Sequence, residues 1–269
     1  MIIERTADLL RDLYGPDLKR ISIERLIIGI FFTGVKLSDG SGGVAYTPAT
    51  DLHGATCCPS MAAEQPAAGP LRGMSVDHAL ALPARSTLAT LVRLVVMNAL
   101  SSRFLTPDRY HVTYDLDALD LIDPREAGKI GMVGAFIPFL KQLKAIPGID
   151  LSVVERKQET LKPDEMRFYV PAHRAPEVLP ACDTVIITGA SLSNGTIDEL
   201  LAATRPGARV IVTGPTASML PDVLFEHNVS AASGVSVIEP DSALDMLAEG
   251  AGAYHLFRGC MRKINVLKG

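Results

Sequence analysis

Residues 129–143 read Lys-Ile-Gly-Met-Val-Gly-Ala-Phe-Ile-Pro-Phe-Leu-Lys-Gln-Leu. The stretch predicts a strand, a glycine turn and the start of a helix, as in a nucleotide-binding α/β unit. The dinucleotide fingerprint needs its second glycine for close approach to the pyrophosphate and its third for helix–strand packing. Counting from Gly134, this chain has Phe136 and Phe139 at those two positions. We therefore predict the α/β scaffold without its usual dinucleotide.

The chain beyond Tyr110 keeps alternating between strand and helix patterns. We expect strands at 130–134, 151–155, 183–188, 209–213 and 231–238, with helices at 138–145, 196–203, 221–226 and 242–249. Strands that read as nearly continuous Val/Ile runs between helical segments are typical of a parallel sheet covered on both faces. This part is predicted to be a Rossmann-like, doubly wound α/β domain.

The first part of the chain has a different pattern. Residues 24–37 and 43–47 read as two strands, and the Asp-Gly and Gly-Gly pairs between them predict a β-hairpin. An amphipathic helix precedes the hairpin, and a helix at 86–100 is apolar all round and must be buried. We expect a small α+β domain over residues 1–108, followed by the α/β domain over 109–269.

Composition narrows the class of protein. The chain has 269 residues, 48% of them hydrophobic, which is enough for a sizeable core. A formal charge of −4 without a long basic run argues against nucleic acid as a partner. The most apolar stretches, 26–32 and 91–100, fall well short of the roughly 20 residues that cross a bilayer. With no signal-peptide pattern and only four cysteines, we expect a soluble, cytoplasmic protein with reduced thiols; whether it forms homo-oligomers is open.

Three predicted strand ends lead into loops of similar chemistry. The carboxyl ends of parallel strands lie at one edge of a sheet, so these loops should share one crevice. The candidate ligand-binding residues are Gly134, Phe136, Pro138, Thr188, Ser191, Asn194, Thr196, Gly214, Pro215 and Ser218. Backbone N–H groups and hydroxyls there suit an anion or carboxylate. In the structural alternative, Thr196 and Glu199 form a capping box, and Gly214-Pro215 is only a turn.

Glu155 ends the second predicted strand of this domain. Dinucleotide folds keep an acidic residue at about this separation from the glycine turn, where it binds ribose hydroxyls. Glu155 is therefore a candidate for ribose binding, for orienting a substrate amine or for acid–base catalysis. Alternatively, it pairs with Arg156 and Lys157 on the surface.

His53, Cys57 and Cys58 lie close together in a long segment without periodicity. Thiolates and imidazole suit zinc, copper or another thiophilic metal, although adjacent cysteines do not match a recognised zinc pattern. The alternative is a loop with reduced thiols. Cys182 and Cys260 are expected to be buried. The aspartates from Asp115 to Asp123 read as a solvated acidic linker, because no calcium-loop pattern is complete.

Several motifs together resemble a known family. They are Gly43-Val-Ala-Tyr-Thr-Pro48, Val96-Met-Asn98-Ala-Leu-Ser, Gly131-Met-Val-Gly134-Ala-Phe-Ile-Pro138, Val153-Val-Glu155-Arg, Thr188-Gly-Ala-Ser-Leu-Ser-Asn194-Gly-Thr196 and Val212-Thr-Gly214-Pro215. They span nearly the whole chain, and in combination they resemble the heavy-metal-chelation family. The resemblance implies an enolase-N-terminal-like domain, a Rossmann-like domain and an active site between them. It places Asn98 at that site, as a catalytic candidate beside Glu155; the alternative is that Asn98 only bridges backbone groups.

Three functions remain open on the sequence. The first is a metal-handling protein that binds a metal ion or an anionic metal complex in the cleft between the domains. The second is an enzyme for a small carboxylated or nucleotide-like substrate, using S-adenosylmethionine or a nucleotide, since the former does not need the three-glycine turn. The third is a non-catalytic interaction module, because no convincing nucleophile or base is visible. Whether the protein turns over a substrate is undecided.

Overall fold

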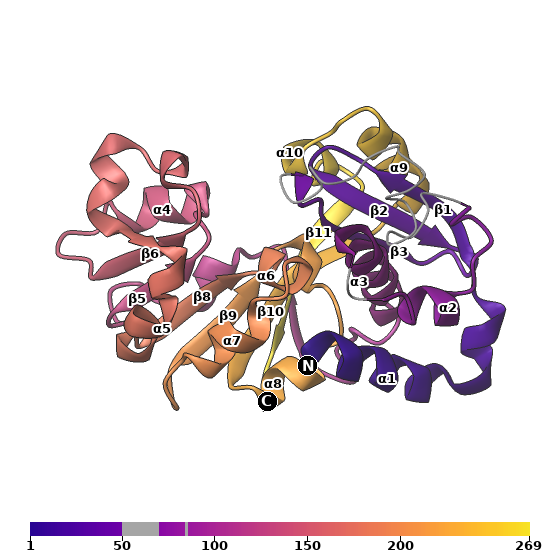
Figure 1. Cartoon of the computed structure of the whole chain (residues 1–269), viewed down its shortest axis with the longest axis horizontal. Helices are drawn as coiled ribbons and strands as arrows, with labels where there is room; N and C mark the ends of the chain where they lie inside the picture. The colour runs from indigo at the N-terminus through magenta and orange to yellow at the C-terminus, as the bar shows by residue number, and fades with distance from the viewer. Residues whose placement is uncertain (50–69, 84–85) are drawn as a thin grey trace.

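The computed structural model describes residues 1–49, 70–83 and 86–269, and within these ranges the strands form two sheets (Figure 1). The small sheet is antiparallel and has the order β1 (Ile23–Ile28), β2 (Phe32–Leu37), β3 (Gly42–Tyr46). The large sheet has the order β4 (His111–Tyr114), β11 (Met261–Leu267), β10 (Val229–Val237), β9 (Arg209–Thr213), β8 (Thr184–Thr188), β5 (Ile130–Val133), β6 (Leu151–Glu155), β7 (Tyr169–Pro171). Its pairs from β10 to β7 are parallel. The predicted two-part α/β fold is confirmed.

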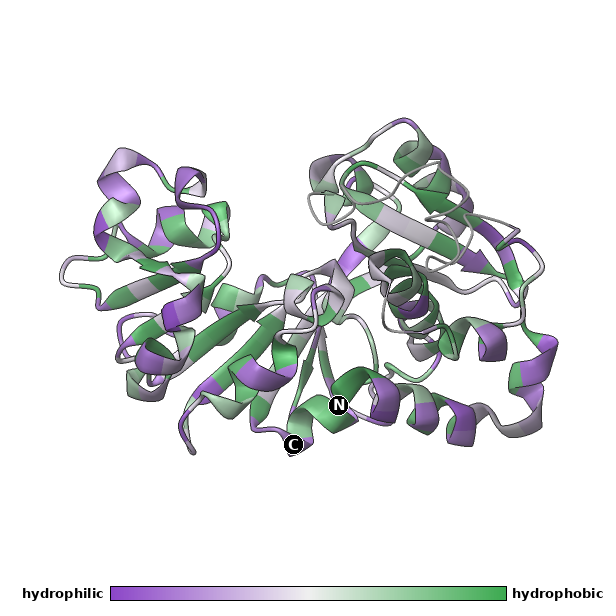
Figure 2. Cartoon of the chain, in the orientation of Figure 1, coloured by the Kyte–Doolittle hydropathy of each residue, from purple (hydrophilic) through white to green (hydrophobic). Residues whose placement is uncertain are grey.

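Ten α-helices lie in the described ranges: α1 (Ile2–Tyr14), α2 (Val76–Leu80), α3 (Thr87–Ser101), α4 (Ile137–Leu143), α5 (Ala175–Val178), α6 (Ala190–Ser193), α7 (Ile197–Ala202), α8 (Asp222–Glu226), α9 (Pro240–Ala248) and α10 (Ala253–Leu256). None of them is long and apolar enough to span a membrane. The helix predicted to be buried is confirmed as α3, which is buried from Ala89 to Ser101. Figure 2 shows hydrophobic colouring on α3 and on the central strands of the large sheet, and a hydrophilic outer side on α1.

The small sheet lies between two helices that come from distant parts of the sequence. On one face, Gly43 of β3 lies so close to the Val95 carbonyl and the Ala99 amide of α3 that a Cβ atom would clash with both. On the other face, a Cβ atom at Gly34 would be only 2.5 Å from the Leu247 side chain of α9. The two glycines therefore allow both helices to approach the sheet closely.

Two expectations from the sequence were wrong here. We expected helix 242–249 to cover the parallel sheet, but α9 packs on the small sheet. Leu244 and Leu247 fill the space above Gly34 and Val44 there. Residues 24–37 were expected to form one strand, but a turn separates β1 from β2. The Gly29 amide donates to the Phe32 carbonyl across this turn at 3.1 Å, so the small sheet has three strands. The reversal between β2 and β3 is confirmed by their antiparallel pairing.

The large sheet ends in two antiparallel strands that the sequence did not predict. β11 pairs with β10 on one side and with β4 on the other. The charged residues Arg262 and Lys263 interrupt its apolar pattern, so no strand was predicted there. The carboxyl ends of β5, β6, β8 and β9 still lie at one edge, as the edge rule requires.

Candidate functional site

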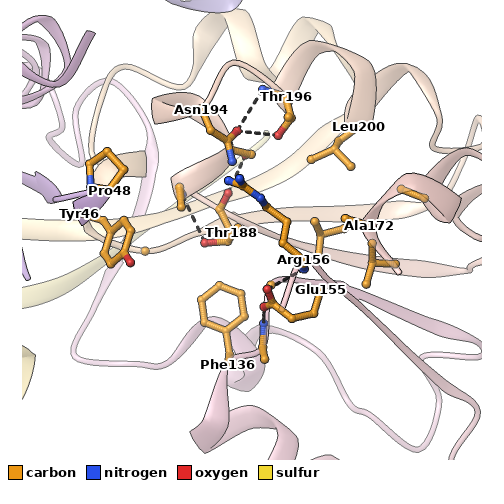
Figure 3. Close-up of a pocket in the computed structure, with 18 of the residues that line it drawn as sticks. Tyr46, Pro48, Phe136, Glu155, Arg156, Ala172, Thr188, Asn194, Thr196 and Leu200 are labelled. Carbon is orange, nitrogen blue, oxygen red and sulfur yellow. Dashed lines mark hydrogen bonds between the residues drawn. The ribbon is translucent and has the colours of Figure 1, made fainter. Parts of the chain in front are cut away.

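A cleft of about 640 Å³ lies between the carboxyl edge of the large sheet and one end of the small sheet (Figure 3). This volume is in the range of small-molecule sites in proteins, roughly 300–1,000 Å³. Nine of the residues predicted from the strand ends line it, namely Gly134, Phe136, Glu155, Thr188, Ser191, Asn194, Thr196, Gly214 and Pro215. The three loops therefore share one crevice, as the edge rule predicted.

Backbone geometry brings the three loops together. Gly134 has φ = +87°, a conformation that glycine adopts without strain, and a Cβ atom there would be 3.0 Å from the Thr188 side chain. Gly214 also has a positive φ, +122°, and the Gly189 amide donates to the carbonyl of Thr213, the residue before it, at 2.7 Å. The loops after β5, β8 and β9 therefore pack directly against one another.

Much of the predicted backbone N–H supply is used within the protein. The Ala135 amide donates to Glu155 and the Phe136 amide to the Gly134 carbonyl. The Ala190 amide donates to Thr188 Oγ1 at 3.3 Å, at the start of the four-residue helix α6. A ligand in the cleft therefore meets chiefly the side chains of these loops.

Glu155 is held by the backbone of two loops. Its Oε2 atom accepts from the Ala135 amide at 2.9 Å, and its Oε1 atom accepts from the amides of Arg156 and Lys157 at 2.7 and 3.2 Å. The contacts with Arg156 and Lys157 are therefore through the main chain, which fixes the turn after β6. In Figure 3 the Arg156 side chain points across the cleft toward Asn194.

The capping box, the structural alternative for Thr196, is not formed. Thr196 is the N-cap residue of α7 but makes no side-chain cap bond. Its hydroxyl instead donates to Asn194 Oδ1 at 2.7 Å, and the same oxygen accepts the Thr196 amide at 3.2 Å. Asn194 thus forms a local turn, and this turn competes successfully with the cap.

The other wall of the cleft was missed by sequence reasoning. Phe32, Tyr46 and Pro48 contribute to it from the small sheet and the residues after it. Phe32 and Tyr46 are in edge contact, with ring centroids 6.5 Å apart. Across the cleft, Phe136 is stacked on Phe139 at 5.2 Å with an interplanar angle of 26°. The two phenylalanines in the glycine positions of the fingerprint thus support an aromatic surface.

Two cationic side chains and a histidine were also missed as site residues. Arg156, Lys157 and His173 line the cleft, together with the carboxylate of Glu199. Arg156 and Lys157 directly follow Glu155 in the sequence, and this adjacency was the only available signal. His173 comes from the short helical segment after β7, a strand that the sequence pattern did not predict.

Three predicted residues do not line the cleft. Pro138 is exposed on α4. Ser218 is buried, with its hydroxyl donating to the Pro215 carbonyl and accepting from the Val235 amide. Asn98 is 2% exposed, and its Nδ2 group donates to the carbonyls of Val44, Pro215 and Thr216 at 2.7, 3.1 and 3.3 Å. Asn98 therefore bridges backbone groups, connecting β3 to the loop after β9.

The predicted metal ligands His53, Cys57 and Cys58 lie outside the described residues. Among the residues that the structure describes, no group of three or more His, Cys, Asp or Glu side chains is arranged to hold a metal ion. In the acidic segment, Asp117 pairs with Lys263 and Asp120 accepts the Asp117 amide.

The two described cysteines are buried, as predicted. Burial raises the pKa of both thiols, Cys182 and Cys260, above the ordinary value. A raised pKa keeps a thiol protonated at neutral pH, and the thiolate is the form that binds metals. Neither cysteine is therefore suited to be a metal ligand as it stands in the structure.

Comparison with known proteins agrees with this architecture. Two solved structures of DUF364-family proteins of unknown function are similar over nearly the whole chain. One is from Pyrococcus horikoshii, with a TM-score of 0.78 and 20% identity over 100% of both chains. The other, from Desulfitobacterium hafniense DCB-2, has a TM-score of 0.70 and 22% identity over 97% of this chain and 99% of that one. At these identities they show the shared fold.

In sequence, an uncharacterised protein of Methanocaldococcus jannaschii is 31% identical over 148 residues, and the match covers 55% of this chain and only 55% of that relative. The DUF4213 family model, described as "Putative heavy-metal chelation", matches residues 11–101. The DUF364 model carries the same description and matches residues 117–266, more than half of the sequence. On that match, the chain belongs to the DUF364 family.

Proposed function

We propose that the protein binds a small anionic metal complex in the cleft between its two sheets. The observation that carries the proposal is the composition of the cleft, in which cationic side chains, hydroxyls and aromatic rings line a space of about 640 Å³. A family description of heavy-metal chelation supports a metal as part of the ligand.

The donor set favours a complex over a bare ion in this part of the molecule. A bare transition-metal ion needs three or four His, Cys, Asp or Glu ligands, and the described residues hold no such group. A complex already supplies ligands to its metal and presents an anionic, polar surface. Arg156 and Lys157 suit such a surface by charge, and Thr188 by its hydroxyl, which accepts the Ala190 amide and keeps its own proton to donate.

The test is the composition of protein purified without an affinity tag or chelator and then supplied with ferric citrate. Plasma mass spectrometry would measure bound metal, and native mass spectrometry would measure the mass of the whole complex. Ala172 lines the cleft, so Ala172→Phe should reduce binding by filling it. Ala145 is exposed and does not line the cleft, so Ala145→Phe is the matched control. Equal loading of the two variants would contradict the proposal.

A bare-ion site at His53, Cys57 and Cys58 remains a separate prediction. A Cys57→Ser/Cys58→Ser variant tests it with zinc sulfate as the probe. Suppose that this variant loses zinc while Ala172→Phe still binds ferric citrate as the parent protein does. The metal-handling function would then belong to the segment that carries these residues and not to the cleft. Unchanged zinc binding in the double variant would exclude the thiols as ligands.

One observation favours a second function, an enzyme that uses S-adenosylmethionine or another nucleoside. Gly134 and Glu155, at the ends of β5 and β6, both line the cleft, as in nucleotide-binding units. Against it, Phe136 occupies the approach to the turn, and both Glu155 oxygens already accept backbone N–H groups. A ligand at a hundredfold excess over its dissociation constant stabilises the native state by roughly 2.7 kcal/mol, so melting curves with a nucleoside panel decide. Unchanged curves would contradict this second function.

A further inference from the structure

The cleft has an aromatic end that is built from both walls. Phe136 is half-buried and is supported from behind by Phe139, a buried residue, so its stacked position is fixed. Tyr46 is 40% exposed and is supported by Phe32. Figure 3 shows Tyr46, Pro48 and Phe136 toward one side of the cleft, and Ala172 and Leu200 toward the other. Exposed aromatic faces that are held rigidly in a cleft favour a flat apolar group.

The position of Tyr46 is fixed by its main chain. The Tyr46 amide donates to Thr216 Oγ1 at 3.0 Å, and Thr216 is 1% exposed and belongs to the loop after β9. Asn98 adds a second connection between the same two segments, through the Val44 and Thr216 carbonyls. These hydrogen bonds hold the Tyr46 main chain against the loop after β9, so the small-sheet side of the aromatic end is present before a ligand binds.

Next to the aromatic end, the cleft carries a cationic turn. Glu155 accepts the amides of Arg156 and Lys157, so its carboxylate shapes the backbone from which both cationic side chains project. The Arg156 side chain lies between the aromatic residues and Leu200 in Figure 3. A guanidinium presents its donors in a planar fork that matches a carboxylate.

We infer that the organic ligand of the cleft is a planar aromatic carboxylate, whose ring lies against Phe136 and Tyr46 and whose carboxylate binds at Arg156 and Lys157. The inference rests on the proposed function and names the chemistry of the organic part of its ligand. An amine bound by Glu155 is disfavoured because three backbone N–H groups already share its carboxylate, and the amine probe below tests binding at Glu199.

The test uses three metal-free probes of similar size with the whole protein. 2-Naphthoate has the ring and the charge, decahydro-2-naphthoate keeps the charge without the flat ring, and 2-naphthylmethylamine keeps the ring with the opposite charge. Isothermal titration calorimetry gives each dissociation constant. We expect 2-naphthoate to bind about tenfold more tightly than the saturated acid, as aromatic contacts allow, and the amine not to bind.

Variants test which residues bind the ring and which bind the carboxylate of the ligand. Phe136→Leu and Tyr46→Leu should each weaken 2-naphthoate about fivefold, and Arg156→Gln should weaken it about tenfold or more. Phe31→Leu and Lys141→Gln are matched controls, because both residues are exposed and neither lines the cleft; they should leave binding unchanged. Circular dichroism of each variant separates a loss of binding from a loss of folding.

The outcomes distinguish the inference from the proposed function. Equal binding of the flat and saturated acids, or preferred binding of the amine, would overturn the aromatic carboxylate. Absence of 2-naphthoate binding at millimolar concentration would also overturn it, and the proposed function would survive if ferric citrate still bound to the parent protein and not to Ala172→Phe. Failure of both probes would reject both.

Discussion

The two walls of the cleft differ in how the sequence encodes them. The wall from the large sheet consists of loops at strand ends, with Gly134, Thr188 and Gly214 at their starts. The wall from the small sheet consists of Phe32, Tyr46 and Pro48; the last two lie in the Gly43–Pro48 motif, but no pattern there marked them as site residues. The first wall follows from local patterns and the topology of parallel sheets. The second exists only because distant segments pack together, so it must be sought in the structure.

The two walls also differ in what holds them in place. The small-sheet wall depends on the close approach of β3 to α3 and on the Asn98 bridge. Beside the large-sheet wall, α4 and the short helix at Pro163–Phe168, which do not line the cleft, are connected by ion pairs from Lys144 to Asp164 and Glu165. The variants below perturb each kind of support, beginning with the largest expected effect.

Gly43→Ala should be the most damaging change. The added Cβ atom would clash with backbone atoms of Val95 and Ala99, which cannot move without displacing α3 from β3. We expect a loss of about 3 kcal/mol in the free energy of unfolding, at the upper end of overpacking effects, measured by urea denaturation. Gly252→Ala is the control, because a Cβ atom there has no neighbour within 4 Å. Similar losses for the two variants would contradict the account of the small-sheet wall.

Asn98→Ala should have the next largest effect. It removes the donor to three carbonyls, of which the Pro215 carbonyl keeps the Ser218 hydroxyl, and the loss of these buried hydrogen bonds costs about 2 kcal/mol. Asn194→Ala is the control, since Asn194 is exposed and its side chain serves a local turn. Hydrogen exchange should show faster exchange at residues 44–46 and 214–216 in the Asn98 variant only. Faster hydrogen exchange confined to α3 would mean that the Asn98 bridge does not hold the two walls together.

The region beside the large-sheet wall, where Lys144 pairs with Asp164 and Glu165, should be sensitive to acid. The hydrogen bonds from Lys144 lower the pKa of both Asp164 and Glu165 below the ordinary values. A lowered folded-state pKa stabilises the protein above the unfolded pKa, near 4, and this contribution is lost as the pH falls through the folded pKa. Lys144→Met should therefore be less stable than the parent protein at pH 7, and the difference should shrink toward pH 3.

Urea denaturation midpoints of Lys144→Met and the parent protein at pH 7 and pH 3 measure this pH dependence. We expect the loss of stability at pH 7 to be smaller than that in Asn98→Ala. Arg20→Met is the control, because Arg20 pairs with Asp17 at an exposed site. A difference between Lys144→Met and the parent protein that does not change with pH would show that the ion pairs contribute through packing rather than charge.

Thr196→Ala should have the smallest effect. Its hydroxyl bonds to Asn194 at an exposed turn, so we expect a loss of about 0.5 kcal/mol. Ser86→Ala is the comparison, because Ser86 Oγ accepts the Ala89 amide at the start of α3 and a lost cap costs about 1 kcal/mol. A larger loss at Thr196 than at Ser86 would support the capping role, which was the structural alternative for Thr196.

These contrasts show where sequence reasoning succeeded. The periodic elements, the buried helix α3 and the shared crevice follow from local apolar patterns and strand order, and the structure has all three. Comparison with the three-glycine dinucleotide fingerprint also showed that Phe136 stands where a dinucleotide site needs glycine. The assignment of parts 1–108 and 109–269 to enolase-N-terminal-like and Rossmann-like domains stays a prediction.

The failures have one physical cause. The turn at Gly29, the placement of α9 and the role of Asn98 depend on contacts between segments far apart in the chain. No local pattern reveals which helix will cover Gly34 or which carbonyls will receive an amide. Thr196 shows the same limit at short range. Its hydroxyl could cap helix α7 or bond to Asn194, and the structure has the bond to Asn194.

The position of α9 on the small sheet also constrains the order in which the protein can mature on the ribosome. β1 to β3 are synthesised early, but the helix that covers one of their faces, Pro240–Ala248, emerges only near the end of translation. Until then, Val44 and its apolar neighbours on that face lack their native cover. Nascent chains with exposed apolar sheet surface are prone to aggregate, so the uncovered face of the small sheet is an aggregation risk until the second half of the chain is made.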